Sequence, residues 1–128
     1  MRFVINTHWH GDHTGGNESF SGGGALILAH ENVRERMSTE QFIAALDRRV
    51  PASPAAALPV VTFASSVTLH LNGQTIRAIH VGPAHTDGDV IVHFSPANVI
   101  HTGDVYVAGM YPFVDLSSGC LLYTSDAA

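Results

Sequence analysis

The alternation of apolar and polar positions divides the first part of the chain into short strands and helices. Two apolar runs rich in strand-forming residues, residues 2–6 and 25–29, are expected to be buried strands. A flexible turn after the first run leads to a short helical piece around residues 18–20. Residues 30–37 are expected to begin a helix, because two of their apolar side chains lie four positions apart and share one helical face.

A further helix is expected after Ser38 and Thr39, which are typical of a helix cap. The apolar stripe of this helix would be formed by Phe42, Ile43 and Leu46. Residues 51–59 are rich in proline and alanine, so they favour a surface linker over a helix interior. We interpret this linker as joining two halves of one domain.

The second half of the chain has the two-residue period of β-strands. Residues 67–71 and 74–81 alternate in polarity on either side of an Asn-Gly pair at 72–73, which is a strong signal for a hairpin turn. Residues 89–94 are expected to form another strand, and residues 99–101 a last buried strand. The whole pattern predicts a mixed α/β domain.

The candidate chemistry is concentrated in residues 7–14, directly after the first predicted strand. His8, His10, Asp12 and His13 follow the spacing H-x-H-x-D-H. Side chains two apart on an extended chain share a face, so His8 and His10 are expected to bind one ion together, and Asp12 and His13 a second ion after a glycine turn. Imidazole and carboxylate ligands suit zinc, with iron or manganese as competitors.

Two later positions complete the predicted site. His85 lies in a loop at residues 83–89 bracketed by proline and glycine, and it is the natural third ligand for the ion of His8 and His10. Asp104 comes just after the strand at residues 99–101, where its two oxygens are free to bridge two ions. Loops that follow strands are the usual place for such sites.

The remaining candidate side chains have simpler interpretations. The histidines expected to be structural are His30, His70, His80 and His93. His101 is either structural or contacts and orients one of the metal ligands without binding the ion itself. Trp9 is expected in the core and Asp89 at the start of a strand. The residues that either line a substrate pocket or cover the core are Tyr106, Met110, Tyr111 and Phe113.

Length and composition limit the classes of function. The chain of 128 residues fits one domain, and its hydrophobic fraction of 45% is typical of a globular protein. A net charge of −5 with only six Lys plus Arg argues against nucleic acid as a partner, and no apolar run approaches a membrane span. One cysteine, Cys120, excludes an internal disulfide. The expected partner is a small-molecule substrate.

The three motifs, H-x-H-x-D-H, a histidine after a strand, and a strand ending in T-G-D, resemble in this order the metallo-β-lactamase superfamily of metallohydrolases. The resemblance extends from residue 2 to about residue 119. The ligands that it implies are His8, His10 and His85 for a first ion, and Asp12 and His13 for a second ion, with Asp104 as the bridge. The implied fold is an α/β (α+β) architecture, a partial αβ/βα sandwich with mixed sheets inside outer helices.

The chain departs from the family pattern at both ends. The family has another strand layer before this start and a further His ligand well after Asp104, and neither occurs here. We therefore expect truncation at both ends, with a partial metallo-β-lactamase domain at residues 1–119 and a tail foreign to the family at residues 120–128. The sequence assigns no compartment, because a signal peptide, if the parent protein had one, would lie before the present start.

The chemistry that the resemblance implies is hydrolysis by a metal-bound hydroxide, with two Zn²⁺ ions in the parent protein. The expected substrate is an ester, thioester, lactone or amide, and Asp12 would orient the hydroxide or accept its proton. Asp104 makes a β-lactam less favoured, since zinc β-lactamases usually carry another residue there. Two other interpretations are a mononuclear iron dioxygenase of the same fold, and a non-catalytic fragment that binds at most one metal.

Overall fold

The computed structural model of the chain describes residues 1–111, 113 and 115–120. The elements are, in order, β1 (Phe3–Ile5), α1 (Gly11–Thr14), α2 (Asn17–Gly22), β2 (Leu26–His30), α3 (Glu31–Met37), β3 (Gln41–Ile43), η1 (Ala44–Leu46), β4 (Arg48–Val50), η2 (Ala55–Ala57), β5 (Val61–Phe63), β6 (Ser66–Leu71), β7 (Gln74–His80), β8 (Val90–Ser95), β9 (Val99–His101) and η3 (Leu116–Ser118). The part of the predicted tail beyond residue 120 lies outside the described residues.

A parallel sheet is built from β1, β2 and β5, with β2 in the centre. Helices lie in the connections between these strands, as parallel pairing requires. The first two strands lie at the apolar runs predicted from the sequence. The predicted burial is confirmed for β2 apart from Leu26, whereas β1 is only half-buried. β5 was missed, because its three residues follow the proline-rich segment and form a strand by pairing with β2.

An antiparallel sheet follows in the order β6-β7-β8-β9. The predicted hairpin turn between β6 and β7 is confirmed, with Asn72 and Gly73 both at positive φ, 52° and 71°. β9 was predicted to be buried, and this is wrong, since all three of its residues are exposed. It is one of the two edge strands of this sheet, and within the described part of the chain it pairs only with β8.

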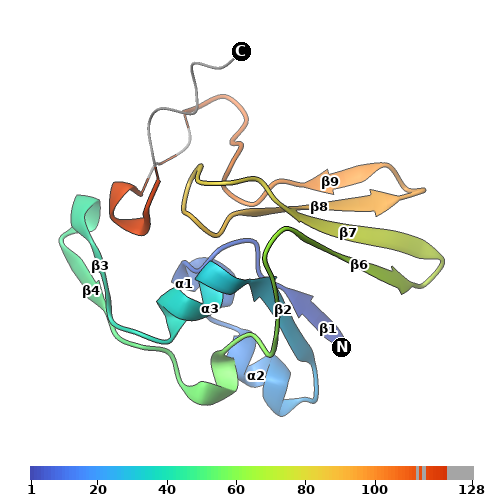
Figure 1. Cartoon of the computed structure of the whole chain (residues 1–128), viewed down its shortest axis with the longest axis horizontal. Helices are drawn as coiled ribbons and strands as arrows, with labels where there is room; N and C mark the ends of the chain where they lie inside the picture. The colour runs from blue at the N-terminus through green and yellow to red at the C-terminus, as the bar shows by residue number, and fades with distance from the viewer. Residues whose placement is uncertain (112, 114, 121–128) are drawn as a thin grey trace.

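The two sheets pack against each other through one core cluster. Ala78, Val90 and Val92 of the antiparallel sheet contact Ile5 and Phe63 of the parallel sheet. A second cluster fills the space between the parallel sheet and α3, and consists of Trp9, Ala29, Val33, Met37, Ile43 and Ala57. Figure 1 shows the helices grouped with the parallel sheet and the antiparallel sheet beside it. This arrangement confirms the predicted fold class, a partial sandwich of sheets and helices.

The helix predicted after Ser38 and Thr39, with its stripe of Phe42, Ile43 and Leu46, is wrong. α3 ends at Met37, and the following segment forms a hairpin of β3 and β4 joined by η1. Cross-strand contacts favour the hairpin, because Phe42 pairs with Arg49, whose guanidinium lies 5.8 Å from the centre of the ring. Ile43 is buried and Leu46 is exposed, so the supposed stripe has no common apolar face.

In the part of the chain that the structure describes, no helix combines the length and the apolar character needed to pass through a bilayer.

Candidate metal centre

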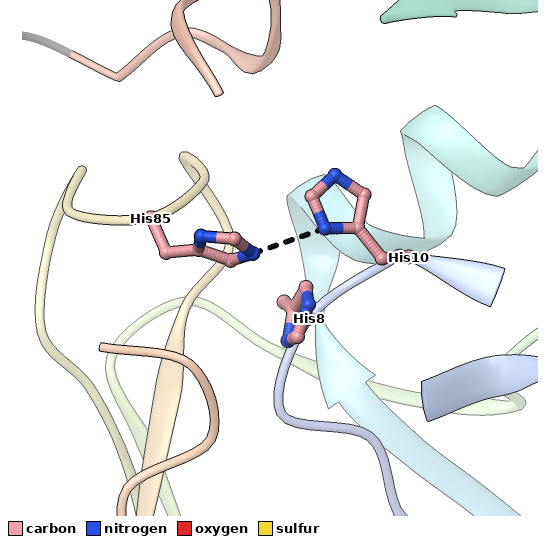
Figure 2. A group of neighbouring side chains, drawn as sticks. All are labelled: His8, His10 and His85. Carbon is pink, nitrogen blue, oxygen red and sulfur yellow. Dashed lines mark hydrogen bonds between the residues drawn. The ribbon is translucent and has the colours of Figure 1, made fainter. Parts of the chain in front are cut away.

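Three histidines from two parts of the fold meet at the junction of the sheets. His8 and His10 lie in the segment between β1 and α1, and His85 lies in the loop between β7 and β8. One nitrogen from each ring falls within 4.8 Å of the others, and Figure 2 shows the three rings facing a common point. The Val90 amide donates to the Thr7 carbonyl at 2.8 Å and so holds the two segments together. The structure thus brings together the three residues predicted for the first ion.

The local reason for the convergence differs from the predicted one. β1 ends at Ile5, so His8 and His10 do not share the face of a strand. The chain instead bends after Asn6, and His10 directly precedes α1 with extended backbone angles, φ −61° and ψ 148°. The centres of the two rings lie 4.9 Å apart across this bend.

Hydrogen bonds set the tautomers of two of these rings. The second nitrogen of His10, Nε2, lies 3.1 Å from the Asp115 carboxylate, so it carries the proton. His85 Nδ1 contacts the Phe113 carbonyl, which can only accept, so this nitrogen is also the protonated one. In the neutral rings, the lone pairs of His10 Nδ1 and His85 Nε2 therefore face each other at 3.0 Å.

His8 adds the third nitrogen of the group, and this nitrogen is the one that lacks a hydrogen-bond partner. Its ring is buried, and its Nε2 has no hydrogen-bond partner among the described residues. Burial, reinforced by the neighbouring rings of His13, His85 and His10, lowers the pKa of His8 from 6.5 to about 2. Burial is also the main reason that the pKa of His10 is lowered, against the opposing effect of Asp115. Both rings are therefore neutral at neutral pH.

This donor set fits a metal cation. Buried polar atoms normally have partners, yet among the described residues one nitrogen has none and two lone pairs oppose each other. A cation with imidazole ligands would satisfy all three nitrogens at once, as in zinc sites with three protein ligands. The tautomers leave Nδ1 of His10 and Nε2 of His85 as the atoms that would bind it, and the unpartnered Nε2 of His8 would be the third.

A second group of candidate ligands lies beside the first. His8, His13 and Asp104 form it, with His13 Nε2 3.1 Å from Asp104 Oδ1. The other oxygen of Asp104, Oδ2, lies 4.0 Å from His8 Nε2 and 3.7 Å from His85 Nε2. Asp104 thus stands between the two groups, which is the place predicted for a bridging carboxylate.

Asp12 is the predicted ligand that converges least. Its carboxylate lies 3.3 Å from His13 Nε2, but it belongs to neither group of three converging ligand atoms in the described chain. Its side chain projects from the start of α1 and is 75% exposed. The structure therefore leaves Asp12 at the rim of the site.

Gly103 brings Asp104 close to the first motif. It has a φ of +56°, and a Cβ at this position would lie 2.8 Å from the Cβ of Thr7. Only glycine combines this backbone conformation with so close an approach. The glycine of the T-G-D motif thus allows the loop after β9 to approach the histidines.

Two carboxylates that support the site were missed from the sequence. Asp89, interpreted as the start of a strand, is buried and accepts hydrogen bonds from the backbone of His85 and from the backbone and hydroxyl of Thr86. Asp115 had no assigned role, although it begins η3 as an N-cap and contacts His10. The D-x-S pattern at residues 115–117 was the one available signal, and it indicates a cap without revealing the partner.

The other histidines take no part in either group. His30 and His80 stack with their ring centres 3.8 Å apart, while His70 and His93 lie on strands of the antiparallel sheet. His101 accepts a hydrogen bond from the Gly103 amide, so it supports the loop that carries Asp104. Trp9 is buried in the core, as predicted.

A cavity of about 520 Å³ opens beside the histidines and the hairpin of β3 and β4. Its apolar wall includes Ile43, Leu46, Val50 and Phe113, and Asp12 and Asp104 line its polar side. The sequence left four residues that either line a substrate pocket or cover the core, and of these Phe113 lines this cavity. The other three, Tyr106, Met110 and Tyr111, are exposed.

A larger cavity of about 820 Å³ lies between β1 and the antiparallel sheet and touches the site only at Thr7, Asp12 and His13.

Comparisons with known proteins identify the family of the chain. The sequence model of the metallo-beta-lactamase superfamily matches residues 2–128. A hydroxyacylglutathione hydrolase from Hyphomonas neptunium is 31% identical over 106 residues, which cover 82% of this chain and 34% of that protein. The chain thus spans about a third of the length of this curated relative.

Solved structures show the same fold. A metallo-beta-lactamase from Pontibacter korlensis is 25% identical, with a TM-score of 0.62 over 80% of this chain and 41% of that one. A metallo-beta-lactamase with a HARLDQ motif from Cronobacter sakazakii is 23% identical, with a TM-score of 0.68 over 91% of this chain and 46% of that one.

Proposed function

This chain belongs to the metallo-beta-lactamase superfamily, and on that premise we propose that it carries the metal site of a zinc-dependent hydrolase. The proposed substrate is a small molecule with an ester, thioester, lactone or amide bond. The observation that carries the proposal is the convergence of three ring nitrogens, one of them buried and without a hydrogen-bond partner among the described residues. Iron or manganese are the competing metals for the same ligands.

The proposed ligands divide into two sites. His8, His10 and His85 would hold the first ion. His13 and Asp12 would hold the second, with Asp104 bridging, because Asp104 directs one oxygen to His13 and the other toward His8 and His85. A bound zinc ion lowers the pKa of a coordinated water from 15.7 to about 7 and so supplies hydroxide at neutral pH.

The protein side chains would position and move protons around this hydroxide. Asp12 is exposed at the rim of the cavity, so its carboxylate is placed to accept a proton from water or to orient it. The apolar wall formed by the hairpin would bind the body of the substrate and exclude water from the bond that is cleaved. Serine or cysteine nucleophiles are not required for this chemistry.

The curated relative favours a thioester as the substrate, and the cavity adds a preference for a carboxylate on it. The relative's name describes it as a hydrolase of hydroxyacylglutathione, a thioester. Arg48 is the one arginine or lysine among the residues lining the 520 Å³ cavity, so an acyl or thiol part that carries a carboxylate would find a counter-charge there.

A mononuclear iron dioxygenase remains the second candidate. Its support is the position of Asp104 Oδ2, 3.7 Å from His85 and 4.0 Å from His8, since two histidines and a carboxylate can also hold one iron. One iron per chain together with oxygen uptake would favour this function over hydrolysis.

The test is to prepare residues 1–128, dialyse the protein against zinc, and measure both metal content and hydrolysis of thioester, lactone and β-lactam substrates. We expect bound zinc and detectable thioester hydrolysis, both lost in His10→Ala. The matched control is His70→Ala, an exposed histidine on β6 that should change neither. A folded wild-type protein that retains no metal would overturn the proposal.

A further inference from the structure

We propose that Asp115 is a positioning residue that fixes both His10 and His85 for metal binding. The proposal rests on the metal site proposed above and adds a residue outside the predicted ligands. Asp115 lies eleven positions after Asp104, just before η3, and its side chain is almost fully buried. A buried carboxylate needs partners, and these partners are what connect it to the site.

Asp115 holds two of the three histidines by different atoms. Its Oδ2 lies 3.1 Å from His10 Nε2, and its backbone amide donates to the His85 carbonyl at 3.1 Å. His10 precedes Asp115 by 105 positions and His85 precedes it by 30. One residue therefore joins the segment after β1 to the loop before β8, and movement of Asp115 would disturb both ligands.

The Asp115 carboxylate accepts hydrogen bonds from several donors at once. Oδ1 accepts from the amide and the hydroxyl of Ser117, and Oδ2 accepts from the hydroxyl of Ser118. These donors approach both oxygens, so the carboxylate acts as an acceptor toward His10 as well. An ionised carboxylate only accepts, so it requires a proton on His10 Nε2.

The tautomer of His10 decides which atom can bind a metal. With the proton on Nε2, the lone pair lies on Nδ1, which is the nitrogen that faces His85 Nε2 at 3.0 Å (Figure 2). The opposite tautomer would direct an N–H into the cluster and remove a ligand. A carboxylate behind a ligating histidine also raises the basicity of the ring.

Trp9 ties the same helix to the metal-binding motif. Its indole nitrogen donates to the Ser118 hydroxyl at 2.9 Å, and that hydroxyl contacts Asp115. Trp9 lies between the two histidines in the sequence and is buried in the core. η3 is thus fixed to the motif at two adjacent residues, which makes the position of Asp115 part of the rigid framework of the site.

The simpler interpretation is that Asp115 only caps η3. The variant Asp115→Asn separates the two roles, because asparagine is an equally good cap but is neutral and carries both a donor and an acceptor. If the positioning role is correct, this variant should bind Zn²⁺ or Co²⁺ about 10–100-fold more weakly, the usual effect of losing an outer partner of a ligand. The unfolding midpoint of the metal-free protein should change little.

A spectroscopic measurement tests the tautomer without any metal. Imidazole nitrogen chemical shifts of the ¹⁵N-labelled, metal-free protein should show His10 protonated at Nε2, and Asp115→Asn should give a mixture of tautomers. The matched control is Asp47→Asn, the same change at an exposed residue of the η1 turn, which should alter neither the shifts nor the metal affinity.

The outcomes distinguish this proposal from the proposed function. If the wild-type protein binds Co²⁺ and His8→Ala does not, the metal site stands, and an Asp115→Asn variant with unchanged affinity and an unchanged His10 tautomer would overturn the positioning role alone. If wild type and His8→Ala both fail to bind Zn²⁺ or Co²⁺, the metal site itself is overturned. An affinity loss that is fully explained by lower stability of the metal-free variant would reduce Asp115 to a cap.

Discussion

The two groups of candidate ligands differ in how firmly the protein holds them. The side chains of His8, His10 and His85 are 1%, 11% and 3% exposed, and the last two have their outer nitrogens bonded to Asp115 and Phe113. In the other group, His13 is 24% and Asp104 36% exposed. The first group is therefore shaped by the fold before an ion arrives, whereas an ion would do more of the ordering in the second.

The largest effect is expected for the residue that belongs to both groups. His8→Ala should abolish binding at the first site and weaken the second, because a metal ligand contributes more than the 10–100-fold attributed to an outer partner. His85→Ala should affect the first ion only. Metal content after dialysis measures both, and selective loss of one ion in His8→Ala would contradict its shared position.

Asp104→Ala should remove the second ion and spare the first. Three histidines remain on the first ion, so the second ion should be lost, or weakened by more than the roughly 10–100-fold attributed to an outer partner, while the first is retained. Titration with zinc in the presence of a chelating indicator resolves the two steps. Equal loss of both ions would show that the groups are not separable.

Gly103→Ala should show how much the second group depends on the backbone of its loop. The new Cβ would lie 2.8 Å from Thr7 Cβ, so the substitution combines an unfavourable φ with overpacking. Gly73→Ala is the matched control, with a φ of +71° and open space around it. We expect Gly103→Ala to lower the free energy of unfolding by roughly 1–3 kcal/mol more than Gly73→Ala.

A smaller effect is expected from a histidine outside both groups. Burial, followed by the adjacent His80, lowers the pKa of His30, while Ala64, Glu31 and Asp87 oppose the shift. Since the folded protein binds this proton more weakly than the unfolded chain, the stabilisation is present above pH 6.5 and is lost as the pH falls toward the lowered value.

Denaturant unfolding of the metal-free protein between pH 7.5 and 5 measures this contribution. His30→Gln should reduce the loss of stability on acidification by at most about 1.4 kcal/mol per pH unit. His70→Gln, on an exposed face of β6, should leave the slope unchanged. An equal slope in wild type and His30→Gln would show that His30 does not titrate in this range.

The sequence predicted those features whose cause is local. The β6–β7 hairpin follows from its Asn-Gly turn, and the candidate ligands follow from residue type and spacing within a few positions. The β3–β4 hairpin was taken for a helix because three apolar residues also fit a helical period, and pairing across the hairpin decided between the two.

Features that depend on distant contacts were not predicted. Asp115 acts on a ring 105 positions away, and nothing near it in the sequence indicates that partner. The exposure of β9 depends equally on what packs over the edge of its sheet. Asp12 illustrates the converse, since the spacing of its motif placed it among the ligands while its position on α1 leaves it at the rim.

The hydrogen bond from Val90 to Thr7 has a consequence for motion. It joins β8 to the segment that carries His8 and His10, so it fixes the distance between the two layers close to the point where the three rings meet. Any sliding of one layer over the other would separate His85 from His8 before it disturbed either sheet internally. Binding of an ion there would therefore depend on the spacing between the layers and would in turn fix it. Slower amide exchange at Val90 on metal binding would show this coupling between the ion and the contact of the layers.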